Sequence, residues 1–184
     1  MTFLSNQDIA RKLESGKPIP AARAANHVQN WPGLYSIWID NAANLPPPFS
    51  PILQENKTTL LYIGKADDLF ARLIEQDLNH KNASTFFRGL GAILGFRPGR
   101  GSLIGKANEN NYRFSDSDTA AIIQWIKEHI LVRFAKVEID RIKEAEKYAI
   151  KRRCPLLNTL LNPKKLKCLA DLRLECRRVA LLME

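Results

Sequence analysis

Hydrophobic residues alternate with other residues in three segments, and this alternation predicts three β-strands. Residues 33–39 present two largely apolar faces, which is the pattern of a central strand. Residues 58–63 are β-branched and aromatic and predict a second strand, antiparallel to the first. Residues 131–138 alternate well enough to form a third. The segments together predict a small, mainly antiparallel sheet.

Apolar residues three and four positions apart predict helices around these strands. The helix over residues 5–14 begins at Ser5, whose hydroxyl can cap it. A second helix runs from Asp67 or Asp68 to Leu78. Further helices are predicted at residues 21–28, 86–96, 140–153 and 164–183, and from Ser115 onward. The predicted fold class is therefore α/β (α+β), a three-stranded sheet flanked by helices, with helical additions at both ends.

Residues 41–56 interrupt the periodic pattern. The segment contains four of the ten prolines, which are Pro46, Pro47, Pro48 and Pro51. Proline lacks a backbone N–H and disrupts helix and strand interiors. We therefore predict a long loop here, without a helix or strand, between the first two strands.

The charge of the chain is positive and unevenly spread. The length of 184 residues suits one domain of ordinary size, and the 45% hydrophobic content supports a real core. The net charge is +9, and residues 141–184 contain 12 Lys/Arg against 5 Asp/Glu. Such a basic segment attracts polyanions, although a solvated helix face would have the same composition.

Several classes of protein and site are excluded by composition. The chain has no apolar run of about 18 residues for a membrane span, and residues 1–20 lack a secretory hydrophobic region. A cytoplasmic location is the expectation. The three cysteines and three histidines do not have the spacing of a disulfide framework, a zinc finger or a histidine metal site.

One carboxylate lies on the apolar side of the helix predicted at residues 140–153. Glu146 falls within the arc formed by the apolar residues Ile139, Ile142, Ala145, Ala149 and Ile150. An ionised carboxylate is costly there unless a cation, a metal or strong donors compensate it. Two interpretations stay open: a buried ion pair with an arginine, or a ligand for Mg²⁺ or Mn²⁺.

Four other polar residues have ordinary explanations when each is taken alone. Tyr35 and Tyr62 can be core tyrosines whose hydroxyls are hydrogen-bonded. Arg72 lies beside the apolar face of its helix and can form a surface salt bridge. Asn158 follows a helix end, where asparagine is a common turn residue.

Their joint spacing is more informative. Gly33-Leu34-Tyr35 is followed by Tyr62-Ile63-Gly64, and Arg72 stands ten positions after Tyr62. Glu146 stands twelve positions before Asn158, the last residue of Pro155-Leu156-Leu157-Asn158. This order resembles a GIY-YIG nuclease domain.

The resemblance implies a role for each residue. Tyr35 takes a proton from the attacking water, and Tyr62 forms hydrogen bonds beside it. Arg72 contacts the scissile phosphate, with Lys65 as a second cation there. Glu146 binds the Mg²⁺ or Mn²⁺ ion.

Three further residues have supporting roles in this resemblance. Asn158 holds the catalytic elements in register, whereas Gly33 and Gly64 let the strand backbones pass close to one another or to phosphate. A phenol with a pKa of about 10 is a poor base at neutral pH. We therefore expect the basic surroundings to lower the barrier for Tyr35.

The resemblance also implies a division of the chain. The nuclease-like domain covers residues 32–162, after a helical extension over 1–31 and before a basic C-terminal helix over 163–184. The proline-rich loop at 41–57 is longer than is usual in the family, and so is the stretch from Arg72 to Glu146, which contains the loop at 97–113. These insertions are expected to shape substrate choice or to cover the site.

The function implied by the resemblance is metal-dependent hydrolysis of DNA phosphodiester bonds, with Mg²⁺ or Mn²⁺ as cofactor. A catalytically inactive nucleic-acid-binding module of the same fold is an alternative. A third is a protein-interaction domain that dimerises through the C-terminal helix, because that segment is apolar as well as basic. The expected partner is nucleic acid, most of all DNA, and the expected state is a monomer or a homodimer.

Overall fold

A four-stranded antiparallel sheet forms the centre of the molecule. The computed structural model describes residues 4–81, 84–108 and 110–183. Its strands are β1 (Ile19–Pro20), β2 (Gly33–Ile39), β3 (Leu60–Ala66) and β4 (Ile130–Lys136), in the order β1-β4-β2-β3. β2 is central, as predicted, and β3 is an edge strand. The sequence does not predict β1, because two residues are too few for an alternating pattern.

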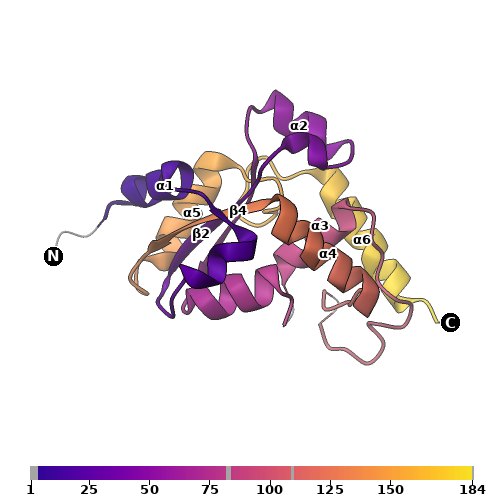
Figure 1. The fold of residues 1–184 in the computed structure, drawn as a ribbon. Helices are drawn as coiled ribbons and strands as arrows, with labels where there is room; N and C mark the ends of the chain where they lie inside the picture. Colours follow the sequence, from indigo (N-terminus) through magenta and orange to yellow (C-terminus); the bar gives the residue numbers. More distant parts are fainter. Residues whose placement is uncertain (1–3, 82–83, 109, 184) are drawn as a thin grey trace.

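Helices cover both faces of this sheet (Figure 1). On one face, α1 (Asn6–Ser15) and α5 (Ile142–Arg153) enclose a small core with apolar residues of the strands. The other helices contribute to a larger core on the opposite face. They are η1 (Ala21–Asn26), η2 (Ala42–Asn44), α2 (Phe49–Glu55), η3 (Phe70–Leu78), α3 (Thr85–Ile93), α4 (Asp116–His129) and α6 (Lys167–Leu181).

The ends of the strands follow from their pairing with β2. β2 has the predicted bounds, whereas β3 begins and ends later than the predicted 58–63. β3 continues to Ala66 because that residue pairs with Gly33, the first residue of β2. β4 ends at Lys136 for the same reason, since Lys136 pairs with Gly33 from the other side.

The ends of the helices follow from local capping. Ser5 and Asp8 form a reciprocal capping box at the start of α1. The carboxylate of Asp68 accepts a hydrogen bond from the Ala71 N–H at 3.0 Å at the start of η3. α5 ends at Cys154, which has a left-handed conformation with φ of 47°, directly before Pro155.

The prediction that residues 41–56 contain no helix is wrong. α2 spans Phe49–Glu55, and Pro51 is its third residue. The first four N–H groups of a helix have no intrahelical partner, so a proline in the first turn removes no hydrogen bond. Phe49 and Leu53 of α2 are buried in the larger core.

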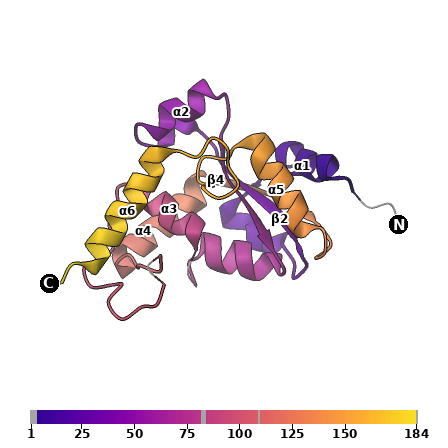
Figure 2. The ribbon, with the colours of Figure 1, turned by 180° about the vertical axis from the view of Figure 1, so that it is seen from behind.

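The C-terminal helix is confirmed, and its apolar face packs inside the chain. α6 runs next to α3 (Figure 2), and it buries Leu169, Cys176 and Ala180 in the larger core. Leu181 and Leu182, at its end, stay about half exposed. Within the described ranges, no helix is both long and apolar enough to cross a membrane.

Two leucines in the segment after α5 test how far the core extends. Leu157 is fully buried, whereas Leu160 is 78% exposed. Leu157→Ala should lower the free energy of unfolding by about 2–5 kcal/mol, because it leaves a cavity in the core. The matched Leu160→Ala should change it by less than about 0.5 kcal/mol. Urea denaturation followed by circular dichroism measures both, and equal effects would contradict the packing described.

Candidate active site

The two glycine-containing tripeptides lie side by side on neighbouring strands. Tyr35 of β2 pairs with Gly64 of β3, and Ile37 pairs with Tyr62. A Cβ atom on Gly64 would lie 2.3 Å from the ring and hydroxyl of Tyr35. Gly64 is therefore required by the tyrosine opposite, since any side chain would displace that ring.

Gly33 lies against the backbone of β4 and not against a side-chain ring. A Cβ atom there would lie 2.4 Å from the carbonyl oxygen of Ala135 in β4. The close approach of two strand backbones expected for Gly33 is therefore present. For Gly64 the close neighbour is the Tyr35 side chain.

A surface cavity of about 450 Å³ lies between β3, η3 and α5. Four of the predicted site residues line it: Tyr62, Lys65, Arg72 and Glu146. They come from three different elements, so the fold brings them together from positions up to 84 residues apart. Tyr35 and Asn158 do not line this cavity.

Glu146 forms an ion pair with Lys65. The Lys65 Nζ lies 2.8 Å from Glu146 Oε2, and the two side chains are 39% and 15% exposed. The partner is thus the lysine next to the second tripeptide and not an arginine. Because the pair is at the cavity wall, it brings a cation and a carboxylate to the same surface.

The apolar arc predicted around Glu146 is largely correct. Ile142, Ala145, Ala149 and Ile150 are buried, but Ile139 is 63% exposed. Ile139 precedes α5, which begins at Ile142, so helical periodicity does not apply to it.

Beneath the cavity, a buried carboxylate joins three elements. Asp77 of η3 is fully buried and accepts hydrogen bonds from the hydroxyls of Tyr35 and Ser84, the latter at 2.6 Å. The guanidinium of Arg72 lies 3.5 Å from Asp77, and its Nε donates to the Tyr35 oxygen at 3.3 Å. Gln76 accepts from Arg72 Nη1 at 2.8 Å. Arg72 is thus held on three sides while it faces the cavity.

The π-helical form of η3 makes this arrangement possible. In a π-helix the hydrogen bonds run between residues five apart, and such turns are frequent at functional sites. Arg72 and Asp77 are five apart, so both face the strand that carries Tyr35.

The pKa values of both tyrosines are raised, despite the basic residues around them. Burial raises the pKa of Tyr35 well above its ordinary value, and the charge of Asp77 adds to this effect. Burial also raises the pKa of Tyr62, to about 12. Arg72 acts in the opposite direction on both groups, but burial outweighs it.

Asn158 supports the edge of β3. Its side-chain oxygen accepts from the Ile63 N–H and its amide donates to the Ile63 carbonyl, both at 2.9 Å. The Leu157 N–H also donates to the Leu61 carbonyl at 2.8 Å. The segment after α5 therefore replaces a neighbouring strand along this part of the edge.

The match with a family model extends beyond the tripeptides. The model of the GIY-YIG catalytic domain matches residues 33–178, which include every site residue discussed above. The chain belongs to the GIY-YIG family. Comparison with curated proteins and with solved structures gave no match.

The GIY-YIG family implies a divalent metal ion, and Glu146, Asp67 and Asp68 are the carboxylates that line the cavity. Glu146 lies at the cavity wall, and Mg²⁺ commonly takes one or two carboxylates together with water and phosphate oxygens. In the described part of the chain, no three His, Cys, Asp or Glu side chains form a metal-binding group. The residues present therefore fit an ion that shares Glu146 with solvent and substrate, and not one enclosed by protein ligands.

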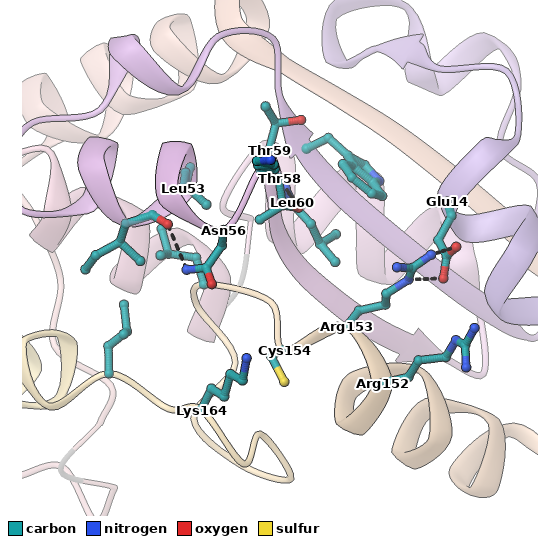
Figure 3. Close-up of a pocket in the computed structure, with 15 residues that line it drawn as sticks. Glu14, Leu53, Asn56, Thr58, Thr59, Leu60, Arg152, Arg153, Cys154 and Lys164 are labelled. Atoms are coloured by element: carbon teal, nitrogen blue, oxygen red, sulfur yellow. Dashed lines mark hydrogen bonds and ion pairs between the residues drawn. The ribbon is translucent and has the colours of Figure 1, made fainter.

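A cavity larger than the candidate site lies elsewhere in the structure (Figure 3). It has a volume of about 730 Å³, and none of the predicted site residues lines it. Arg152, Arg153 and Lys164 line it together with polar residues that precede β3, and Arg153 is paired with Glu14. Size alone does not identify the GIY-YIG site.

Asp77 is the site residue that the sequence analysis missed. It follows the buried Leu73 by four positions and directly precedes the buried Leu78. It therefore interrupts an apolar helix face, as Glu146 does. The same test of periodicity, applied to η3, would have found it.

The burial of Asp77 predicts a pH-dependent contribution to stability. Burial raises the pKa of Asp77, against the opposing effect of Arg72. Stability from a carboxyl with a raised folded pKa is fully present below about pH 4 and is lost as the pH rises through the folded pKa. The free energy of unfolding of the wild type, relative to Asp77→Asn, should therefore fall as the pH rises above 4.

Urea denaturation between pH 4 and pH 8 measures this difference. Asp140→Asn is the matched control, because it makes the same substitution at an exposed position. A wild-type advantage that grows with pH would show that Asp77 is stabilised as a carboxylate, contrary to this prediction.

Proposed function

We propose that the chain is a metal-dependent endonuclease that hydrolyses phosphodiester bonds of DNA. Membership of the GIY-YIG family supports a nuclease, which acts on nucleic acid. The observation that carries the finer proposal is that Lys65, Arg72 and Glu146 line one cavity. Two cations can bind a phosphate, and a carboxylate can hold a hard metal ion beside it.

Arg72 is the residue best placed to bind the scissile phosphate. Its guanidinium contacts Gln76, Asp77 and Tyr35, which fix its orientation before substrate arrives. A preorganised guanidinium can stabilise the charge that develops on the phosphate oxygens without further rearrangement. Lys65 adds a second positive charge at the same cavity.

Glu146 would hold the Mg²⁺ or Mn²⁺ ion. When bound there, such an ion would supply positive charge that stabilises the leaving 3′ oxygen. Lys65 lies against Glu146, so it compensates the carboxylate and keeps it at the cavity wall. The remaining steps depend on the chain's own side chains.

Proton transfer from the attacking water is assigned to Tyr35, with Asp77 as the second proton carrier. The Tyr35 hydroxyl donates to Asp77, and burial raises the pKa of both groups. Tyr35 can accept a proton from water while its own proton passes to Asp77 Oδ2, so no free phenolate is formed. A carboxylate with a raised pKa is a better proton acceptor for this transfer.

The first test is cleavage of DNA by the purified chain with Mg²⁺ or Mn²⁺. Glu146→Gln should fold normally and lose at least about 100-fold in rate, because the metal ligand is removed. Glu144→Gln is the matched control on an exposed position of the same helix, and it should cut like the wild type. Duplex, branched and single-stranded substrates identify the form of DNA preferred.

Two results would contradict the proposal. Equal cleavage by Glu146→Gln and the wild type would remove Glu146 from catalysis. Binding of DNA without cleavage by the wild type, under all these conditions, would favour the inactive binding module.

The second test addresses the proton path. Tyr35→Phe and Asp77→Asn should each lower kcat by at least about tenfold, because both groups carry the proton taken from the attacking water. The double variant should lose little more than the worse single variant, because the two groups act as a unit.

Tyr62→Phe distinguishes the alternative, since Tyr62 lines the cavity and Tyr35 does not. Loss of cleavage in Tyr62→Phe, with normal rates in Tyr35→Phe, would move the proton acceptor to Tyr62. Circular dichroism checks that each variant is folded.

A further inference from the structure

A third cavity, of about 340 Å³, lies between the C-terminal end of η3, α3, the loop before α4 and the first turns of α4. It contains none of the residues assigned above to catalysis. Its volume is at the lower end of the range for small-ligand sites. The basic residues that line this cavity are its distinctive property.

Arg88 of α3 lines this cavity and is only 7% exposed. Its Nη1 donates to Asn111 Oδ1 at 3.4 Å, and its guanidinium lies over the Tyr112 ring at 5.7 Å from the centroid. Among the described residues, no carboxylate forms a salt bridge with it. A long hydrogen bond and a ring are weak compensation for a buried cation.

Neighbouring positive charges make the Arg88 cation still less favourable. Burial lowers the pKa of Arg88, and the charges of Arg173 and Arg72 act in the same direction. Tyr112 and the more weakly acting Asp77 oppose them. An anionic ligand in the cavity would supply the charge that the described side chains do not.

The rim of the cavity is also positively charged. Lys81, Lys106 and Arg113 line it and are exposed, and Asp116 is the acidic residue in the described lining. Lys81 is already paired with Glu75. The excess of basic groups around one concave site favours a phosphate, whose charge and several acceptor oxygens match a guanidinium fork.

The cavity is physically linked to the proposed active site. Asp77 accepts from Ser84, the N-cap residue of α3, and the Arg88 N–H donates to the Ser84 carbonyl at 3.2 Å. Arg88 is therefore one helical turn from the network that orients Arg72. A nucleic-acid chain bound at Arg72 has further phosphates available for a nearby site.

We propose that the Arg88 cavity binds a second phosphate group of the nucleic-acid substrate, away from the scissile bond. The inference rests on the proposed function for the identity of the substrate. Binding of a second phosphate would position the strand, so it would affect affinity more than the rate of cleavage of bound DNA.

The test measures DNA binding by fluorescence anisotropy in the presence of EDTA, which prevents metal-dependent cutting. Arg88→Gln should weaken binding by about tenfold or more and reduce the slope of log Kd against log salt by about 1. The double variant Lys106→Gln/Arg113→Gln should weaken binding as well, and both of its positions are exposed, so its fold is not at risk.

The matched control is Arg23→Gln/Lys127→Gln, which removes the same two charges from exposed positions that do not line this cavity. It should leave affinity within about twofold of the wild type. Equal weakening in the two double variants would overturn the proposal, because it would reflect total charge. Wild-type affinity in both cavity variants would overturn it too.

Inorganic phosphate distinguishes the source of the phosphate group. Phosphate should raise the Tm of the wild type and compete with DNA, and Arg88→Gln should lose both effects. A rise in Tm that depends on Arg88, without competition against DNA, would overturn the nucleic-acid assignment and indicate a site for a small phosphate compound.

Failure of this inference is distinguishable from failure of the proposed function. DNA binding that depends on Arg88, in a wild type that never cuts, would reject the endonuclease and leave the phosphate site intact. Cleavage that requires Glu146, with Arg88→Gln binding DNA like the wild type, would reject the phosphate site and support the endonuclease.

Discussion

The buried carboxylate of Asp77 is the interaction on which the rest of the site depends. It accepts from Tyr35 on β2 and Ser84 at the start of α3, and it lies against Arg72 on its own helix. A fully buried carboxyl group needs hydrogen-bond partners within the protein, because burial removes those that water would provide. These contacts therefore hold the sheet, the π-helix η3 and the start of α3 together. They also fix the direction in which Arg72 points.

The edge of β3 is the second organising feature. An edge strand exposes backbone groups that need partners, and Asn158 satisfies both groups of Ile63 with one side chain. This closes the middle of the edge and leaves the Lys65 end open to the cavity. The same strand thus carries a structural contact and, two residues later, the ion pair with Glu146.

Charge along the sequence is a poor guide to charge in space. Residues 141–184 contain 12 Lys/Arg against 5 Asp/Glu, yet these side chains are distributed among different surroundings. Arg152 and Lys164 line the cavity of about 730 Å³, whereas Arg173 is turned inward and donates to the Leu157 carbonyl. Arg88 is a buried cation that forms no salt bridge with a described residue, and it lies outside that segment.

The sequence by itself determined the fold class, the bounds of β2, the presence of most helices, and the place of Glu146 on an apolar face. These depend on periodicity, capping and motif spacing, which are local. Only the tertiary structure decided that Lys65 is the partner of Glu146, that Tyr35 lies beneath the cavity, and that Asp77 joins them to Arg72. Those contacts form between elements distant in sequence, and burial, which raises the pKa of Tyr35, exists only once the elements have packed.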